Sequence, residues 1–485
     1  MMHRAIFVLV LAALIGCKQN NEILTTEKPV GEYSSTIQPI FDRSCGTSSC
    51  HGGGPNGFAA GLDLTSYAGL LRGSTYGATV VSGSPFMSNL IRSINPSDTT
   101  LSPVSSVQMP SGRDSLPRSD VQTIARWIRD GARDDNGNLP FPEPRPLGKV
   151  FFTSQFVDLV GVLDRATNLV MRYVTVGRPL PISGVPESPH NVQVDDQGRF
   201  YYVTLISGNK LKKYDAVTNA LVGEVGVGLS PAHVVITRDG SKAYVTNFEP
   251  ATARVFVVNT ATMTVSKIIN FSTTLMNKTH GARLSHDGEY LYVAANLSDN
   301  LAIIQTSTDS VVAIMRVVQD AQLFSAVYKP YQIAVRDDDR FIYVTLSGTG
   351  QLSVIERNRD TFLWRDTVRV GRNPLQCEVT RDMRYVYVCN QGSGSVSVVD
   401  AQTNQLHTTI ANVGTGPHGI DISEDSRTVY VTCENVRGEP PHHPLYGSTA
   451  PGFLVLIDVP SQAVIKRVEV GGFAAGVSVY PGKGN

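Results

Sequence analysis

The residues best suited to chemistry lie near the start of the sequence, where two cysteines and a histidine stand close together. Cys45 and Cys50 enclose four residues, and His51 follows directly. A thiol can add to a haem vinyl group as a thioether, and an adjoining histidine can then ligate the iron. The usual attachment motif is C-x-x-C-H, so this is a variant with a longer gap. The pattern predicts one covalent haem held by Cys45 and Cys50, with His51 as an axial ligand.

Two other chemistries fit the same residues. Cys45 and Cys50 could form a local disulfide in an exported protein. Together with His51 they could also supply three of the four ligands of a zinc site. The residues on either side of the motif favour haem over both.

A haem of this type usually has a second axial ligand, and methionine in that position raises the reduction potential. Met109 lies in a polar segment with no helical apolar period, so the common core-filling role of methionine suits it poorly. Met87 is the reserve candidate, but its neighbours Phe86, Leu90 and Ile91 favour a packing role. We therefore expect Met109 to be the distal ligand.

Helices are expected on both sides of the motif. Ile37, Ile40 and Phe41 recur at spacings of three and four before Cys45. A second apolar face follows Met109 and consists of Val121, Ile124, Ala125, Trp127 and Ile128. The two helices would pack on each other over the haem.

Residues 36–133 resemble a small class I cytochrome c, particularly those fused to other domains in exported bacterial proteins. The resemblance implies an all-α cytochrome c domain at 35–133 with one covalent haem c and a role in electron transfer. The matching pieces, in order, are Ile37-Gln38-Pro39-Ile40-Phe41, Cys50-His51-Gly52, Leu62-Asp63-Leu64, Gln108-Met109-Pro110 and Trp127-Ile128-Arg129-Asp130-Gly131-Ala132.

The N-terminus predicts export and a lipid anchor. His3 and Arg4 precede an apolar run at 5–15. This run is too short to span a bilayer and has the pattern of a signal peptide. The run ends in Leu14-Ile15-Gly16-Cys17, which resembles a bacterial lipobox and implies lipidation of Cys17. A plain secretory signal with an incidental cysteine is the alternative. We expect a signal at 1–17, a linker at 18–34, and a membrane-anchored bacterial lipoprotein in the periplasm or on the cell surface.

Composition limits the partners and the number of domains. The 485 residues favour two or more domains. With 42 basic and 42 acidic residues there is no electrostatic footprint for nucleic acid. The expected partners are a redox protein or a small-molecule electron donor or acceptor, and the membrane through the lipid anchor. Cys377, Cys389 and Cys433 are expected to be buried thiols.

A polar, proline-rich segment at 134–147 predicts a spacer, and beyond it the chain repeats itself. Each repeat contains a Tyr-Val strand, and successive tyrosines lie 42 to 51 residues apart, as in four-stranded propeller blades. The repeats resemble the YVTN family of bacterial propellers, whose signature is Tyr244-Val245-Thr246-Asn247. The six tyrosines are Tyr202, Tyr244, Tyr292, Tyr343, Tyr387 and Tyr430.

The two ends of the repeat region together predict a seventh blade. Residues 150–153, 160–164 and 171–176 fit a second, third and fourth strand, and 476–480 fit the missing first strand. Closing the ring with strands from both ends hides the sheet edges. The expected fold is therefore a small all-α domain followed by an all-β, seven-bladed propeller at 148–481.

One set of propeller residues has chemical potential. Alignment of the blades on their turns places one residue of each at the start of the innermost strand: His190, Ala232, His280, Tyr331, Leu375, His418 and Ala475. His233 lies one position further along, and an enlarged loop in the sixth blade adds His442 and His443. These histidines are predicted to gather at one mouth of the central channel. Neutral imidazoles there could bind a second metal or cofactor, or act as general acids and bases.

Other roles for this mouth remain open. It could be a substrate or partner surface without metal, or the histidines could only hydrogen-bond to turns. The sequence accordingly supports three functions: electron transfer by an exported mono-haem cytochrome, a periplasmic oxidoreductase with a histidine-lined site, or a surface-binding propeller with an accessory haem domain.

Overall fold

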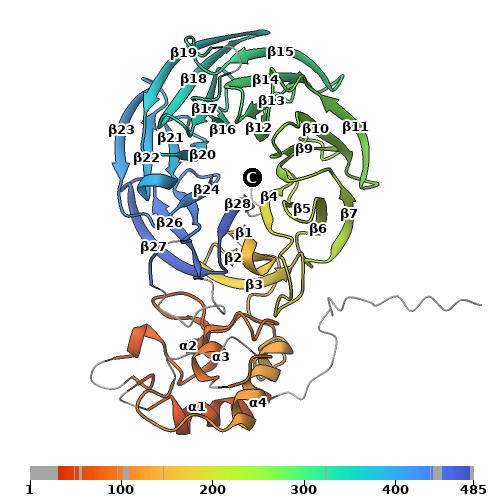
Figure 1. The fold of residues 1–485 in the computed structure, drawn as a ribbon. Coiled ribbons are helices and arrows are strands. Elements are labelled where there is room, and N and C mark those ends of the chain that lie inside the picture. The colour runs from red at the N-terminus through yellow and green to blue at the C-terminus, as the bar shows by residue number, and fades with distance from the viewer. Residues whose placement is uncertain are drawn as a thin grey trace, which may run out of the picture.

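A computed structural model describes residues 31–47, 50–53, 57–95, 97–101, 109–145, 147–322, 325–436, 438–440 and 450–480. It places a small region of short helices beside a ring of β-sheets (Figure 1). Within these ranges, no helix has the length and apolar character needed to cross a membrane. The predicted signal peptide and Cys17 lie outside the described residues.

The N-terminal region consists of short helices joined by long irregular segments. Residues at the predicted spacing before the cysteine motif, Ile37, Ile40 and Phe41, are buried. The helical segments are η1 (Tyr33–Ile37), α1 (Gln38–Ser44), η2 (Ala59–Gly61), α2 (Tyr67–Leu71), α3 (Asn89–Ile94) and α4 (Arg118–Arg129).

Helix α4 contributes its apolar face to the core of this region. All five residues predicted for that face are buried. Trp127 lies against the rings of Tyr33 and Tyr67, with centroid distances of 5.5 and 6.4 Å. The indole Nε1–H donates to Arg133 O at 3.0 Å, and the Tyr67 hydroxyl donates to Ala132 O at 2.7 Å. The chain leaving α4 is thus fastened to the aromatic core.

The remainder of the chain is a propeller of seven four-stranded antiparallel sheets. Figure 1 shows the sheets arranged around a central channel. From the innermost to the outermost strand, the blades are β28 (Ala474–Tyr480), β1 (Lys149–Ser154), β2 (Leu159–Asp164) and β3 (Leu169–Thr175); β4 (Pro189–Val194), β5 (Phe200–Leu205), β6 (Lys210–Asp215) and β7 (Leu221–Gly226); β8 (Pro231–Ile236), β9 (Lys242–Asn247), β10 (Arg254–Asn259) and β11 (Thr264–Asn270); β12 (Thr279–Leu284), β13 (Tyr290–Ala295), β14 (Asn300–Gln305) and β15 (Ser310–Arg316); β16 (Pro330–Val335), β17 (Phe341–Leu346), β18 (Gln351–Asn358) and β19 (Thr361–Arg369); β20 (Pro374–Val379), β21 (Tyr385–Asn390), β22 (Ser395–Asp400) and β23 (Gln405–Ile410); and β24 (Pro417–Ile422), β25 (Thr428–Cys433), β26 (Gly452–Asp458) and β27 (Ala463–Val470).

The two ends of the propeller close the ring as predicted. Strand β28 pairs with β1 in antiparallel register, with Lys149 opposite Tyr480 and Val150 opposite Val479. The last strand of the chain therefore completes the blade begun by the first three. This pairing leaves the circle without an open sheet edge between its first and last blades.

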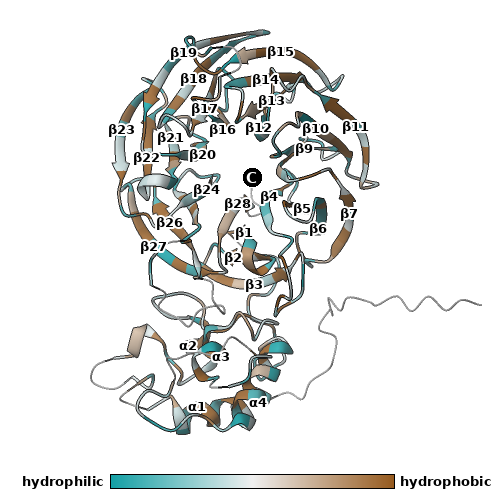
Figure 2. Ribbon diagram, in the orientation of Figure 1, coloured by the Kyte–Doolittle hydropathy of each residue, from teal (hydrophilic) through white to brown (hydrophobic). Residues whose placement is uncertain are grey.

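The repeated tyrosines anchor the second strand in six of the seven blades. All six predicted tyrosines are at most 2% exposed. Figure 2 shows hydrophobic segments recurring around the ring, as expected where sheets are buried on both faces. The packing of these faces, one blade against the next, forms the core of the propeller.

The two parts of the molecule share an apolar interface. Ala78 and Val81 of the N-terminal region pack with Leu169 of β3 and Val468 of β27. Figure 1 shows the helices next to these outer strands. The segment predicted as a spacer also lies against the propeller, where Arg145 pairs with Asp164 at 2.7 Å. The spacer is therefore docked along the propeller.

Candidate functional site

The predicted haem motif lies in the turn that follows α1. The Cys45 N–H donates to Phe41 O at 2.7 Å and so ends the helix. The His51 N–H donates to Cys45 O at 3.2 Å, which folds the loop back on itself. A side chain at Gly52 would meet Gly46 O at 2.2 Å, so this close approach requires glycine. The turn brings Cys45 and His51 together although five residues separate them.

The imidazole of His51 is oriented for binding through one nitrogen. Its Nδ1 lies 3.2 Å from Leu62 O. A carbonyl oxygen only accepts, so Nδ1 carries the hydrogen and Nε2 keeps its lone pair. Burial lowers the pKa of His51, which favours the neutral form that a metal needs. This is the arrangement expected of a ligating histidine fixed by an outer partner.

The two cysteines of the motif differ in burial. Cys45 is 6% exposed and belongs to the core of the N-terminal region, whereas Cys50 is half-buried. Burial, with a smaller effect of Cys50, raises the pKa of Cys45 to about 11. Among the described residues, no cysteine forms a disulfide. The alternative of a disulfide between Cys45 and Cys50 is therefore not what the structure has.

The methionine candidates occupy different surroundings. Met109 is 38% exposed, and its N–H donates to Ser93 O in α3 at 2.8 Å. Met87 is 2% exposed and packs with Val157 and Leu159 at the interface with the propeller. Met87 therefore has a packing role, whereas the Met109 side chain is exposed.

The seven residues predicted to start the innermost strands all occupy the second position of their strands. Each inner strand also has a β-bulge at this end, where its register against the second strand shifts. Bulges re-aim side chains. The third-position side chain of His233 therefore joins the second-position side chains of His190 and His280.

These three histidines form a close group at the channel mouth. One nitrogen from each of His190, His233 and His280 lies within 4.8 Å of the other two. The Nε2 atoms of His190 and His280 are 3.3 Å apart. The ring of His418 also faces His190, with a centroid distance of 5.3 Å. All four rings are buried.

In each of these three histidines, the Nδ1 atom is the outer nitrogen of the ring and contacts a residue outside the group. His190 Nδ1 lies 2.9 Å from Gln155 Nε2, and His280 Nδ1 lies 3.1 Å from Tyr331 O. His233 Nδ1 lies 3.4 Å from Gln332 Nε2. His233 Nε2, in contrast, is buried without a hydrogen-bond partner. The group is thus oriented from outside and has an unused nitrogen inside.

The surroundings keep the group uncharged. Burial, followed by the neighbouring imidazoles, lowers the pKa of His190 and His280 well below the ordinary value. The same causes lower the pKa of His233 to about 3. Neutral imidazole is the form that ligates metals and accepts protons.

The fourth histidine has a carboxylate partner. His418 Nδ1 lies 2.7 Å from Glu434 Oε1, and Gln391 Nε2 donates to the same carboxylate at 3.3 Å. His418 Nε2 faces the hydroxyl of Tyr331 at 3.5 Å. Glu434 thus orients His418 with its second nitrogen toward Tyr331, an arrangement suited to acid–base chemistry.

Threonines of the second strands connect neighbouring blades at this mouth. The Thr246 hydroxyl accepts from the His233 N–H at 3.1 Å and donates to His280 O in the next blade. Thr204 makes the equivalent pair of bonds with Asn191 N and Ala232 O. These hydroxyls satisfy the backbone groups that the bulges release. The repeated threonine therefore positions the mouth histidines.

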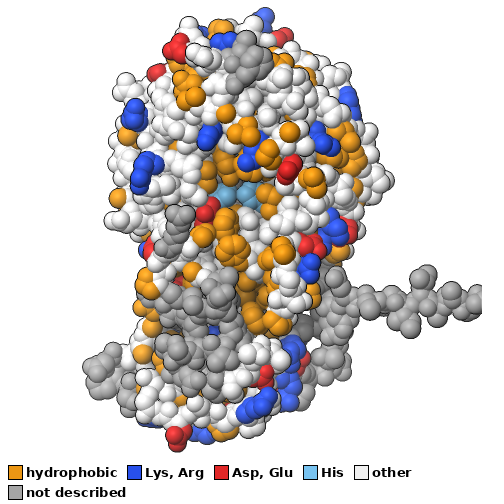
Figure 3. Space-filling model, in the orientation of Figure 1, with side chains coloured by type: hydrophobic (Ala, Val, Ile, Leu, Met, Phe, Trp, Pro, Cys, Tyr) orange, Lys and Arg blue, Asp and Glu red, His pale blue; other side chains and the backbone are white. Residues whose placement is uncertain are grey.

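A cavity of about 440 Å³ opens above the group. His190, His418, Glu434 and Tyr331 line it, together with the aromatic ring of Phe248 and other residues. Figure 3 shows histidine side chains at the bottom of this central hollow. The predicted loop histidines His442 and His443 lie outside the described residues. The cavity is large enough for a small organic molecule.

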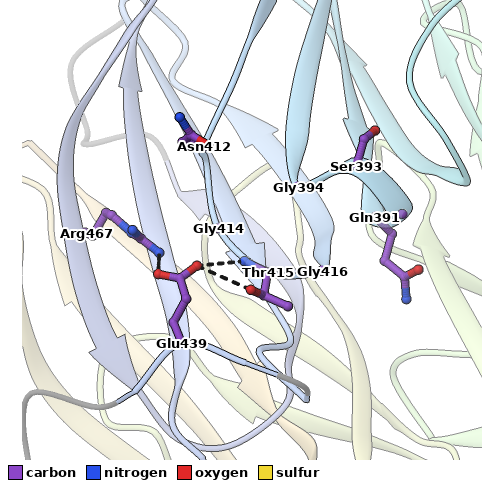
Figure 4. A pocket seen from close by; sticks show the side chains of 10 residues that line it. Gln391, Ser393, Gly394, Asn412, Gly414, Thr415, Gly416, Glu439 and Arg467 are labelled. Carbon is purple, nitrogen blue, oxygen red and sulfur yellow. Dashed lines mark hydrogen bonds and ion pairs between the residues drawn. The ribbon is translucent and has the colours of Figure 1, made fainter.

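A second cavity, of about 410 Å³, lies nearer the rim. Figure 4 shows Glu439 between Arg467 and Thr415. Glu439 forms an ion pair with Arg467 and accepts from the Thr415 N–H at 3.0 Å. Both charged groups already have partners, so this cavity has a weaker case for ligand binding than the channel mouth.

Comparisons with known families agree with the two-part architecture. Residues 48–103 match the family model described as planctomycete cytochrome C, and residues 183–375 match that of lactonase, 7-bladed beta-propeller. The chain combines a cytochrome C-like domain with a seven-bladed propeller. No curated protein matches the sequence.

Solved structures show the same fold at low sequence identity. A functionally unknown protein from Desulfotomaculum acetoxidans is 14% identical with a TM-score of 0.53, over 68% of this chain and 98% of its own. A proposed 6-phosphogluconolactonase from Bacteroides uniformis is 12% identical with the same TM-score, over 69% and 99%. Dihydro-heme d1 dehydrogenase NirN in complex with DHE is 13% identical with a TM-score of 0.48, over 91% of this chain and 98% of its own.

The sequence patterns did not reveal the residues that hold the histidines. Gln332 directly follows Tyr331, as His233 directly follows Ala232. The alignment of the blades therefore already indicated that Gln332 lies at the channel mouth. The threonines after the repeated Tyr-Val were a second signal. Gln155 lies in the turn after β1 and follows no repeat, so only the structure reveals its contact with His190.

Proposed function

We propose that this protein is an exported mono-haem c-type cytochrome that transfers electrons. Cys45 and Cys50 would hold the haem covalently, His51 would ligate the iron through Nε2, and Met109 would be the distal ligand. When bound, haem supplies a one-electron redox centre. The orientation of His51, with Nδ1 donating to Leu62 O, is the observation that carries the proposal. The cytochrome C family match supports it.

The chain's own residues would tune this centre. The contact between His51 Nδ1 and Leu62 O fixes the ring and increases the basicity of Nε2. Burial of Cys45 among Phe41 and Leu64 places one attachment point in the apolar core. An apolar surrounding controls solvent access and so the reduction potential.

Covalent haem is tested by expression of the full chain together with a cytochrome c maturation system. We expect an α band in the reduced absorption spectrum and a mass increased by one haem. The double variant Cys45→Ala/Cys50→Ala should lose both, whereas Cys377→Ala, which removes a buried propeller thiol, should keep them. Unmodified mass and no haem spectrum in the parent chain would overturn the proposal.

The distal ligand is tested with two matched variants. Met109→Leu should lower the reduction potential because methionine ligation raises it. Met87→Leu preserves volume at the domain interface and should leave the potential unchanged. Equal potentials for the parent and Met109→Leu would remove Met109 from the site.

We also propose that Cys17 carries a lipid anchor in the periplasm or on the cell surface of a bacterium. The basis is the lipobox-like Leu14-Ile15-Gly16-Cys17 sequence. The electron partner would be a redox protein or a small molecule. Cys17→Ser should move the protein from the membrane fraction to the soluble fraction and abolish labelling with a fatty acid; retention of the label would refute the anchor.

A further inference from the structure

We propose that His190, His233 and His280 bind one copper ion at the mouth of the propeller. The site is separate from the haem motif and belongs to three successive blades, which contribute the inner strands β4, β8 and β12. It rests on two independent observations. The three ring nitrogens are grouped, and one of them, His233 Nε2, is buried with no hydrogen-bond partner.

The spacing of the nitrogens suits a small ion. Nitrogens bound at about 2.0 Å in a tetrahedral site lie about 3.3 Å from each other. The Nε2 atoms of His190 and His280 already have a separation of 3.3 Å. The group as a whole lies within 4.8 Å, so a small rotation of the His233 ring would complete the set.

The outer partners can set all three rings for ligation. His280 Nδ1 must donate to Tyr331 O, which leaves the lone pair on Nε2. Gln332 Oε1 is buried without a partner, so a half-turn of its amide would let it accept from His233 Nδ1. The same half-turn of Gln155 would let its oxygen accept from His190 Nδ1. Outer partners of this kind commonly orient metal-binding histidines.

The donor set favours copper. Three neutral imidazoles supply no negative charge, and the carboxylate of Glu434 is bound to His418. Burial penalises charge, so a singly charged cuprous ion costs less than a divalent one in this site. Imidazole is also a suitable ligand for copper.

The cavity gives such an ion a route to the site. His190 lines the cavity and also belongs to the group. The rings of Tyr331 and Phe248 lie against His280, with centroid distances of 3.7 and 4.6 Å. These aromatic rings cover His280, so entry would take place on the His190 side.

The test measures copper in the full chain after removal of metals by a chelator. The protein is incubated with copper under reducing, anaerobic conditions, desalted and analysed for copper by mass spectrometry, with protein concentration from amino-acid analysis. We expect about one copper per chain and a higher midpoint of thermal unfolding. His190→Ala, His233→Ala and His280→Ala should each lower copper at least about tenfold, whereas His407→Ala, an exposed histidine of β23, should not.

Several outcomes would overturn the site. These are less than about one-tenth copper per chain, retention of copper in all three single variants, equal loss in His407→Ala, or binding of zinc but not copper in a parallel incubation. Circular dichroism of each variant shows whether the propeller remains folded, and His233→Gln replaces His233→Ala if it does not. The copper content is expressed per protein chain and not per iron atom. The result therefore does not depend on whether haem is attached.

Discussion

The molecule has two histidine-bearing regions, and they are built in opposite ways. His51 lies in a turn after the seven-residue helix α1, between irregular segments, and backbone groups of Leu62 and Ala59 hold its ring. The mouth histidines lie on strands joined into a closed ring, and separate partners hold their outer nitrogens. The first region is held by contacts within one short turn. The second is organised before any ligand binds.

The described parts of the two regions meet at the outer strands of two neighbouring blades and, through Met87, at Val157 and Leu159. Ala78 and Val81 pack on β3 and β27, which lie far from the channel in the ring. A change in one region should therefore leave the other intact. The two tryptophans report on them separately, because Trp127 belongs to α4 and Trp364 to β19.

The largest effect is expected from removal of both attachment cysteines. In Cys45→Ala/Cys50→Ala the N-terminal region should lose haem and become sensitive to protease, because a bound group stabilises only the folded form. The propeller should remain resistant. Limited proteolysis followed by mass spectrometry measures this. Simultaneous digestion of both regions would show that they fold as one unit, which would contradict their independence.

Overpacking of β28, the strand that closes the ring, should destabilise only the propeller. A side chain at Gly476 would meet His190 O at 2.7 Å and the Asn191 Cα at 2.8 Å. Gly476→Ala should lower the free energy of unfolding of the propeller by about 3 kcal/mol, because the neighbour is backbone that yields poorly. Chemical denaturation followed by Trp364 fluorescence measures the change.

Gly226 of β7 supplies the control for this substitution. A side chain there would meet no atom within 4 Å. Gly226→Ala should leave the propeller at least as stable as the parent. Equal effects of the two substitutions would mean that the contact between β28 and β4 does not limit stability.

Loss of a threonine hydroxyl that connects two blades should destabilise the channel mouth, but less than the substitution at Gly476 destabilises the propeller. Thr246→Val leaves the N–H of His233 and the carbonyl of His280 without their partner. We expect a loss of about 2 kcal/mol, the usual cost of unsatisfied buried polar groups. Hydrogen exchange should increase at β8 and β12 and not at β20. The equivalent change at Thr204 is the control, and it should loosen β4 and β8 instead.

The smallest effect concerns a carboxylate further along the channel. Burial, with the nearby Glu378, raises the pKa of Asp421 to about 6. A raised acid pKa means that the folded state binds the proton more tightly than the unfolded state. The resulting stability is present at low pH and disappears as the pH rises through 6. Between pH 5 and 7.5 the propeller should lose about 1 kcal/mol from this group.

Asp421→Asn is the matched variant for this effect. The amide oxygen can still accept from the Val479 N–H, which now bonds to Asp421 Oδ2 at 2.7 Å. Thermal unfolding at pH 5 and 7.5 should therefore show a smaller difference in the variant than in the parent. An unchanged difference would assign the pH dependence to other groups.

Local patterns in the sequence predicted much of the fold. The spacing of the tyrosines from Tyr202 to Tyr430 predicted six of the seven blades, because each of these blades repeats one burial pattern. The strand fragments at both ends predicted the closing pair of β1 and β28. The apolar face around Trp127 predicted α4. These features depend on periodicity within short segments, which a single sequence displays directly.

The sites were less predictable, because they combine residues from distant positions. Alignment of the repeats named His190 and His280, but their 3.3 Å separation depends on the bulges and on the curvature of the ring. The contact of Gln155 with His190 crosses blades and follows no repeat. The burial of Met87 under Val157 depends on how the two parts of the chain dock.

The sequence alone therefore determined the chemical inventory of this protein: a thiol and imidazole motif, seven repeated sheets, and histidines in one recurring position. Tertiary structure alone decided which nitrogens face each other, which are held from outside, and which remain without a partner. The physical reason is that burial patterns are local along the chain. Distances between side chains are set by the packing of blades that lie up to hundreds of residues apart.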